Sequence, residues 1–169
     1  VSGNIKLANA GRMTSAKTIS GNVEMLDSKI EGTLEGGTIS GTVKLQRVTA
    51  QALTLSSVSG DVILEDLTCE RVKGQSISGD AQFSGELQPN GRYEFTSHSG
   101  SVRFAVAGKT GFQIEATSFS GDIKIDLPLT LDGTTNAKRR GRAVRGKFGD
   151  GSAFVDLTSF SGSILLSKR

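Results

Sequence analysis

The chain has 169 residues, of which 36% are hydrophobic, 5% aromatic and 22% charged, with 22 glycines, two prolines and no tryptophan. This length fits one domain, residues 1–169, and the regular recurrence of apolar residues argues against a disordered chain. No stretch approaches the ~20 consecutive apolar residues of a membrane span, so no transmembrane segment is expected. The single cysteine, Cys69, excludes an internal disulfide, and the single histidine, His98, adds little metal-binding capacity. We expect no metal site, no cofactor and no catalytic residue.

The positive charge is local. Lysines and arginines number 20 against 17 acidic residues, which gives a net charge of +3. Six of the 20 lie within ten residues: Lys138, Arg139, Arg140, Arg142, Arg145 and Lys147. The rest of the chain is slightly acidic, so the sequence predicts a basic patch and no specific nucleic-acid binding.

An internal repeat runs through the chain. The tetrad Ser-Gly-x-apolar occurs eight times, beginning at Ser2, Ser20, Ser40, Ser59, Ser78, Ser99, Ser120 and Ser161. Successive serines are 18 to 21 residues apart, except for a last gap of 41. That gap spans about two periods, so one copy has diverged or carries an insertion.

Apolar columns flank the tetrad with the two-residue alternation of strands that have one buried face. One column lies three residues after the serine and includes Val23, Val43 and Val62, and another lies six residues before it and includes Leu34 and Leu53. A unit of ~20 residues without a helix must stack on its neighbours to bury such faces. The sequence therefore predicts an all-β fold: one right-handed parallel β-helix, or β-solenoid, of about eight or nine rungs. A β-propeller is less favoured because its blades need ~40 residues.

Residues 126–156 depart from the repeat. Pro128 and Asp132-Gly133 interrupt the rung, the basic cluster follows, and Gly149-Asp150-Gly151 is typical of a tight turn before a strand. We interpret this section as a divergent rung or a basic hairpin. Because the chain also begins and ends inside the repeat, open strand edges are expected at both ends.

Two columns just before the serine suggest further sites. The residue directly before it is apolar in most copies and is His98 in one, so we expect this column, His98 included, to face the core. The residue two before it is Ser or Thr, which predicts a hydroxyl ladder along the rod. Such a ladder raises an ice-binding hypothesis, which the mostly serine composition disfavours.

Two other candidates have simpler interpretations. Asp61, Asp80 and Asp122 follow the glycine of the tetrad, where small polar residues cap turns by accepting backbone N–H bonds. A stacked pair of carboxylates could alternatively hold a cation, but the spacing of calcium-binding solenoids is absent. Cys69 aligns with Ala50 one repeat earlier, which predicts a buried structural thiol.

The recurring motif [Ser/Thr]-apolar-Ser-Gly-[Asp/Asn/Ser]-[Val/Ile], and most specifically Gly149-Asp150-Gly151-Ser152-Ala153 with the final tetrad at Ser161, resembles a family of bacterial domains of unknown function named as adhesins. The resemblance implies a β-solenoid in the cell envelope, periplasmic or at the extracellular surface, and supplies no catalytic residues. The first residues show no basic segment followed by an apolar stretch, so no signal peptide or anchor is expected within this chain.

The leading functional hypothesis is a non-catalytic envelope or surface domain that acts as a binding or assembly scaffold. Its basic hairpin, the six residues Lys138, Arg139, Arg140, Arg142, Arg145 and Lys147, would contact anionic polysaccharide or lipid headgroups. A carbohydrate-active β-helix enzyme is the first alternative, although carboxylates such as Glu24, Glu65, Glu94 and Glu115 are expected in scattered columns. A structural solenoid that associates end to end is the second.

Overall fold

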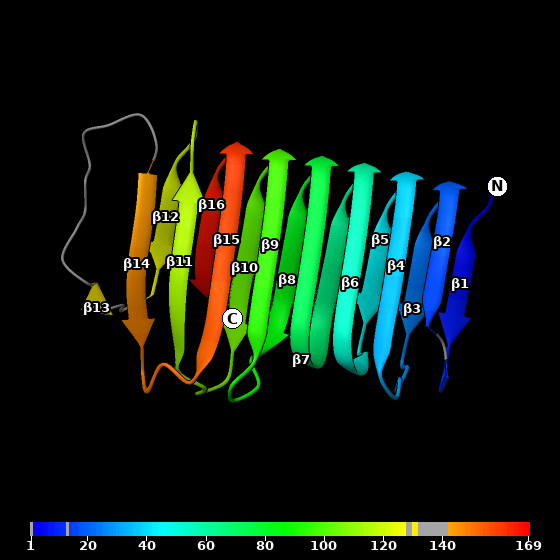
Figure 1. Cartoon of the computed structure of the whole chain (residues 1–169), viewed down its shortest axis with the longest axis horizontal. Coiled ribbons are helices and arrows are strands. Elements are labelled where there is room, and N and C mark those ends of the chain that lie inside the picture. Colours follow the sequence, from blue (N-terminus) through cyan, green and yellow to red (C-terminus); the bar gives the residue numbers. More distant parts are fainter. Residues whose placement is uncertain (1, 13, 128–129, 132–141) are drawn as a thin grey trace.

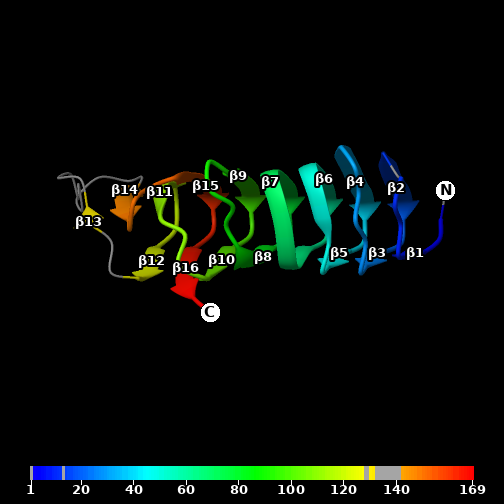
Figure 2. The ribbon, with the colours of Figure 1, turned by 90° about the horizontal axis from the view of Figure 1, so that it is seen from below.

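The computed structural model describes residues 2–12, 14–127, 130–131 and 142–169, and these form a flattened β-solenoid with two broad faces (Figures 1 and 2). The valine column behaves as the repeat requires. Val23 pairs in parallel with Val43, and Val43 with Val62, and all three side chains are buried. The predicted solenoid of stacked ~20-residue rungs is confirmed.

One broad face, here called face A, contains the strands that precede the Ser-Gly bends and, at one end, the two strands β14 (Arg142–Phe148) and β13 (Thr130–Leu131). In spatial order they are β2 (Ser15–Ser20), β4 (Thr33–Ser40), β6 (Thr49–Ser59), the second half of β7 (Val62–Ser78), β9 (Arg92–Ser99), β15 (Ala153–Ser161), β11 (Phe112–Ser118), β14 and β13. All pairs are parallel except β11 with β14 and β14 with β13.

The opposite face, face B, contains strands that follow the bend, and all of its pairs are parallel. Its order is β1 (Ile5–Ala8), β3 (Val23–Leu26), β5 (Val43–Gln46), the first part of β7, β8 (Ala81–Glu86), β10 (Val102–Ala107), β16 (Ile164–Lys168) and β12 (Ile123–Asp126). Figure 2 shows the two faces as layers, with the core between them.

The Ser-Gly bend explains why glycine recurs at one position. Gly60 has φ of 147°, and a Cβ there would overlap the backbone carbonyl of Gly41 in the neighbouring rung. The same overlap recurs along the stack between Gly21, Gly41, Gly60, Gly79, Gly100, Gly162 and Gly121. Glycine is therefore needed at all seven positions for the close approach of successive rungs, and from Gly21 to Gly100 for the backbone angle as well.

Inside the solenoid, large and small side chains alternate along a column. Gly36 and Gly74 lie on either side of Leu55, and a Cβ on Gly36 would overlap the Leu55 side chain. A Cβ on Gly74 would likewise overlap the Phe95 ring of the next rung. These glycines make room for larger core residues, as close packing of interiors requires.

The last rung is not at the end of the stack. β15 pairs in parallel with both β9 and β11, and β16 pairs in parallel with both β10 and β12. In Figure 1 the red strands β15 and β16 accordingly lie between the green strands β9 and β10 and the yellow strands β11 and β12. The order of the rungs in space therefore differs from their order in the sequence after β10. The chain leaves a space between β9–β10 and β11–β12, and its C-terminal strands β15 and β16 fill that space.

Residues 126–156 form the predicted hairpin in part. β13 and β14 are antiparallel, and Gly149 and Gly151, with φ of 61° and 71°, form the tight turn that leads into β15. The hairpin does not project freely, because β14 pairs with β11 from Phe112↔Phe148 to Ser118↔Arg142. Pro128 and Asp132-Gly133 lie outside the described residues.

Candidate binding surface

The predicted basic site is described only in part. Lys138, Arg139 and Arg140 lie outside the described residues, and of Arg142 only the backbone in β14 is described. Arg145 and Lys147 are exposed and pair in register with Glu115 and Gln113. They alternate with Val144, Gly146 and Phe148, and Phe148 packs against the core through a stacked contact with Phe112 at 5.4 Å. Arg145 and Lys147 therefore lie on the outer side of face A.

Arg145 is held by a carboxylate. Its Nη2 and Nε atoms lie 2.5 Å and 3.0 Å from Oε1 of Glu115, and this hydrogen bond raises the pKa of the Arg145 guanidinium. Beside this pair, a groove of about 420 Å³ is lined by residues of β11, β14 and β15 that include Gln113, Lys147 and Phe154. Arg145 and Lys147 are the two residues of the predicted basic site whose side chains are described. Of these two, Lys147 has no carboxylate partner among the described residues.

Three carboxylates share one row on the outer side of face A, which corrects part of the expectation of scattered columns. Asp156 is in register with Glu94 on one side and with Glu115 on the other. Burial raises the pKa of Asp156, and the charges of Glu115 and Glu94 raise it further, against a hydrogen bond from Thr158 and the charge of Arg92. Glu94 and Glu115 both lie five residues before a tetrad serine, so the repeat did contain this signal. Glu24 and Glu65, in register with Lys44 and Gln46, are on face B in different columns, as expected.

The column that includes His98 faces solvent, so the prediction that it faces the core is wrong. Its described members, here called the outer ladder, are in spatial order Ile19, Ile39, Val58, Ile77, His98, Phe160 and Phe119. The aliphatic and phenylalanine members are 44–57% exposed, and His98 is exposed too. The His98 and Phe160 rings stack at 4.8 Å, and the Phe160 and Phe119 rings at 4.9 Å, so the ladder ends in three parallel rings.

The hydroxyl column faces the interior instead. Its serines and Thr38 are at most 5% exposed. Several of its hydroxyls donate to the carbonyls of the glycine bends in adjacent rungs, as in Thr38 to Gly21, Ser97 to Gly79 and Ser118 to Gly162, at 3.0–3.3 Å. These bonds provide donors for the carbonyls of the half-buried glycine bends and tie each rung to the next. A buried column presents no hydroxyl array to water, so the structural basis of the ice-binding hypothesis is absent.

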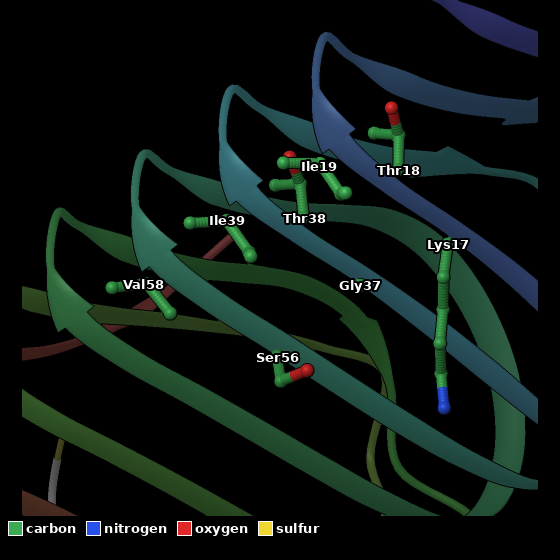
Figure 3. A pocket seen from close by; sticks show the side chains of 8 residues that line it. All are labelled: Lys17, Thr18, Ile19, Gly37, Thr38, Ile39, Ser56 and Val58. Carbon is green, nitrogen blue, oxygen red and sulfur yellow. The ribbon is translucent and has the colours of Figure 1, made fainter. Parts of the chain in front are cut away.

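A notch interrupts the outer side of face A beside the ladder. It has a volume of about 370 Å³ and is lined by Ile19, Ile39 and Val58, with Lys17 and Ser56 at its sides (Figure 3). Equivalent positions in other rungs carry side chains such as Gln75 and Thr96, whereas this one is Gly37. The missing side chain creates the notch, and sequence analysis missed it because it weighed only which residues were present.

The remaining candidates have structural roles. Asp61 and Asp80 each accept a backbone N–H bond from the next rung, from Asp80 at 2.9 Å and from Ser101 at 2.8 Å, which confirms the capping interpretation. Cys69 is buried, and burial raises its pKa to about 11. Among the described residues, no group of three or more His, Cys, Asp or Glu side chains is placed to hold a metal ion. The described part of the chain also contains no helix that could cross a membrane.

The fold thus defines a β-solenoid whose last rung is inserted between two earlier ones. A family model with the description Toastrack DUF4097 matches residues 1–167, and the chain belongs to that family. The family is uncharacterised, and the match supports the resemblance to β-solenoid domains of unknown function. No curated protein and no solved structure shows significant similarity to the chain.

Proposed function

We propose that this domain is a non-catalytic scaffold of the bacterial cell envelope or surface, and that its basic segment, residues 138–147, binds anionic polysaccharide or lipid headgroups. The position of β14 supports the proposal most directly. This strand is antiparallel beside the end of the parallel stack, and it presents Arg145 and Lys147 on the outer side of face A. A rigid solenoid holds these cations in fixed places, which suits recognition of a polymer with repeated negative charge.

Charge distribution gives further support. Outside the cluster, acidic residues outnumber basic ones, and several of the described lysines and arginines are neutralised within the solenoid, as in Lys17 with Glu35 at 2.7 Å and Arg47 with Asp27 at 2.5 Å. Each cation near an anionic membrane surface contributes about 1 kcal/mol, so the five residues of the cluster other than Arg145, which is paired with Glu115, supply substantial attraction.

The test compares two variants of equal net charge. In the first, Lys138, Arg139, Arg140 and Lys147 are replaced by serine, which keeps the Arg145–Glu115 pair intact. In the control, the exposed residues Lys29, Arg71, Lys73 and Lys124 are replaced by serine, and both variants change the net charge from +3 to −1. Retention on phosphatidylglycerol vesicles and on an anionic polysaccharide is measured while the salt concentration is raised. We expect salt-sensitive retention by the wild type and the control only; equal retention by the first variant contradicts the proposal.

The acidic row favours one second candidate, a carbohydrate-active enzyme. Asp156, whose pKa is raised, has the property of a general acid, and Glu94 and Glu115 flank it as bases or nucleophiles would. The row lies on an open face, where water competes for every charge, and this is why we prefer the scaffold. A panel of polysaccharides assayed for reducing or unsaturated ends, with Asp156→Asn as the control variant, tests this candidate.

End-to-end association, the remaining alternative, meets an obstacle on face A. Parallel continuation would place β2 of one copy beside the far end of another, where β14 runs antiparallel to the stack and its outer neighbour β13, although it runs with the stack, has only two residues. On face B, β12 and β1 remain compatible with parallel pairing, because both run in the direction of their neighbours. Concentration-dependent sedimentation of a variant with Ile5→Lys in β1 tests whether this edge is used.

A further inference from the structure

The outer ladder forms the centre of a nearly uncharged band, although 22% of the residues of the whole chain are charged. On one side, the ladder is flanked by the exposed tetrad serines, and on the other by a column that is polar or glycine. This second column consists of Lys17, Gly37, Ser56, Gln75, Thr96, Thr158 and Thr117. Apart from Lys17, which pairs with Glu35, and the one histidine of the ladder, the band has no ionisable side chain. Contiguous apolar surface of this kind marks interaction sites.

The two ends of this band differ in shape. At the end near β2, the notch beside Gly37 is hollow and lined by Ile19, Ile39 and Val58. At the opposite end, Phe160 and Phe119 are 48% and 57% exposed and stack on one another. One molecule thus carries both a hollow that accepts a large apolar side chain and a pair of apolar side chains that could fill it.

From this complementarity we infer that the band binds a second copy of this chain, with the two ladders antiparallel about a two-fold axis. The axis passes through Ile77, the fourth of seven ladder residues, so that Ile77 meets Ile77. Phe160 then faces Ile39 beside the partner's notch, and Phe119 faces Ile19. In such an isologous interface the same contact forms twice, once at each end.

Two features favour a second copy over another kind of partner. Both ladders have the same rung spacing of ~4.8 Å, so contacts stay in register over all seven rungs. The ring faces of Phe160 are covered by His98 and Phe119, so this ring presents its edge to a partner. A ring edge suits insertion into an apolar notch better than stacking on a flat sugar ring.

Charges limit the contact to the band. The next outward column contains Glu35, Lys73 and Asp156, and a wider contact would bring Glu35 opposite Asp156 and Lys73 opposite Lys73. The two sheets therefore diverge away from the ladder. Because salt screens this repulsion, the dimer becomes tighter as ionic strength rises, whereas binding of an anionic polymer becomes weaker.

Association is tested by sedimentation of the full chain over a range of concentrations. We expect a dimer whose dissociation constant rises at least tenfold for Phe160→Ser, which removes the inserted side chain, and for Gly37→Gln, which fills the notch with the side chain found at Gln75. Leu165→Ser removes an exposed leucine from face B and is the control that leaves dimerisation unchanged. Circular dichroism shows whether each variant remains folded.

Crosslinking tests the arrangement. Because Cys69 is buried, cysteines introduced on the ladder react without background. Ile77→Cys should form a disulfide with itself, Ile19→Cys should not, and a mixture of Ile19→Cys with Phe119→Cys should crosslink. A chain that stays monomeric at all concentrations overturns the inference, and so does self-crosslinking of Ile19→Cys. If the chain is monomeric and its binding to vesicles requires Phe160, the outer ladder binds lipid, and this result also overturns the inference.

Discussion

The hydroxyl of Ser159 donates a hydrogen bond of 3.2 Å to the carbonyl of Gly100, 59 residues earlier in the chain. In the regular part of the solenoid the same bond joins residues 15–18 apart, as in Thr38 with Gly21 and Ser97 with Gly79. The long separation exists because the last rung occupies the space that the chain leaves between β9 and β11. Stability near this end therefore depends on residues that are last in the sequence.

Removal of residues 153–169 should release more than the deleted rung. β11 would lose its parallel partner β15, and β12 its partner β16, and both would be left apart from β9 and β10. We expect residues 112–126 and 142–148 to lose protection from hydrogen exchange along with the deleted segment. Removal of residues 1–20, which form a rung with a single neighbour, is the control and should affect only the adjacent rung. Retained protection in residues 112–126 would contradict the prediction.

Substitution at the bend separates backbone strain from steric overlap. Gly3 and Gly60 have similar φ angles of 154° and 147°, but a Cβ on Gly3 meets no atom within 4 Å, whereas one on Gly60 overlaps the Gly41 carbonyl. We expect Gly60→Ala to lower the free energy of unfolding by at least about 2 kcal/mol more than Gly3→Ala. Urea denaturation measures both variants, and equal losses would show that the rungs separate to make room.

The buried hydroxyls are not equivalent. Ser118 donates to the Gly162 carbonyl at 3.0 Å, whereas the Ser57 hydroxyl is buried without a partner among the described residues. Ser118→Ala should therefore cost about 1 kcal/mol, and Ser57→Ala should be neutral or stabilising. Chemical denaturation of the two variants provides the comparison. A loss for Ser57→Ala as large as that for Ser118→Ala would mean that this hydroxyl is hydrogen-bonded in solution.

The acidic row predicts a pH-dependent stability. The pKa of Asp156 is higher in the folded chain than in the unfolded one, so its unfavourable contribution is absent at low pH and develops as the pH rises through the folded pKa. At pH 7, Asp156→Asn should increase the free energy of unfolding by up to about 1 kcal/mol, which is measured as a higher unfolding temperature. This gain should vanish below a pH of about 4. Glu94→Gln removes one repelling charge and should act in the same direction, and a less stable Asp156→Asn at pH 7 would count against the electrostatic account.

Cys69 should be chemically inert until the protein unfolds. Burial raises its pKa to about 11, and its side chain is 1% exposed, so neither the thiolate nor access is available near neutral pH. We expect alkylation by iodoacetamide at pH 8 to be at least 100-fold slower in native protein than in urea. The variant Lys73→Cys carries an exposed cysteine and is the reactive control. Rapid labelling of Cys69 in the native protein would indicate local opening of its rung.

The repeat was sufficient to predict the solenoid, because equivalent residues such as Val23 and Val43 must stack to bury a short unit. It also contained the information that would have placed His98 correctly. Leu34 and Leu53 are buried, and counting in steps of two residues from their column places the hydroxyl column inside and the outer ladder outside. Our interpretation gave more weight to the apolar character of the ladder than to this alternation. Apolar residues on a surface are common, so polarity alone was a poor guide.

Other features could not be derived from the repeat. The insertion of β15 between β9 and β11 depends on which open sheet edge the last rung pairs with. The tetrad at Ser161 has the same pattern as the other tetrads, so it is compatible with pairing to β9 or to β11. Glu94, Asp156 and Glu115 all lie five residues before a tetrad serine, so the repeat contained their shared row, but the place of Asp156 between the other two follows only from that insertion. The pairing of Arg145 with Glu115 required the antiparallel register of β14, which a parallel repeat does not encode.

The inserted rung also has a consequence for synthesis on the ribosome. Earlier rungs can add to the growing stack as they emerge, but β11 and β12 must wait near an open sheet edge until residues 153–168 have left the exit tunnel. During that interval the unfilled edges of β9 and β10 are open to any strand of suitable register, including one from a neighbouring nascent chain. Slow translation of the C-terminal segment should therefore increase misassembly, and chaperones that shield sheet edges should matter most at this stage.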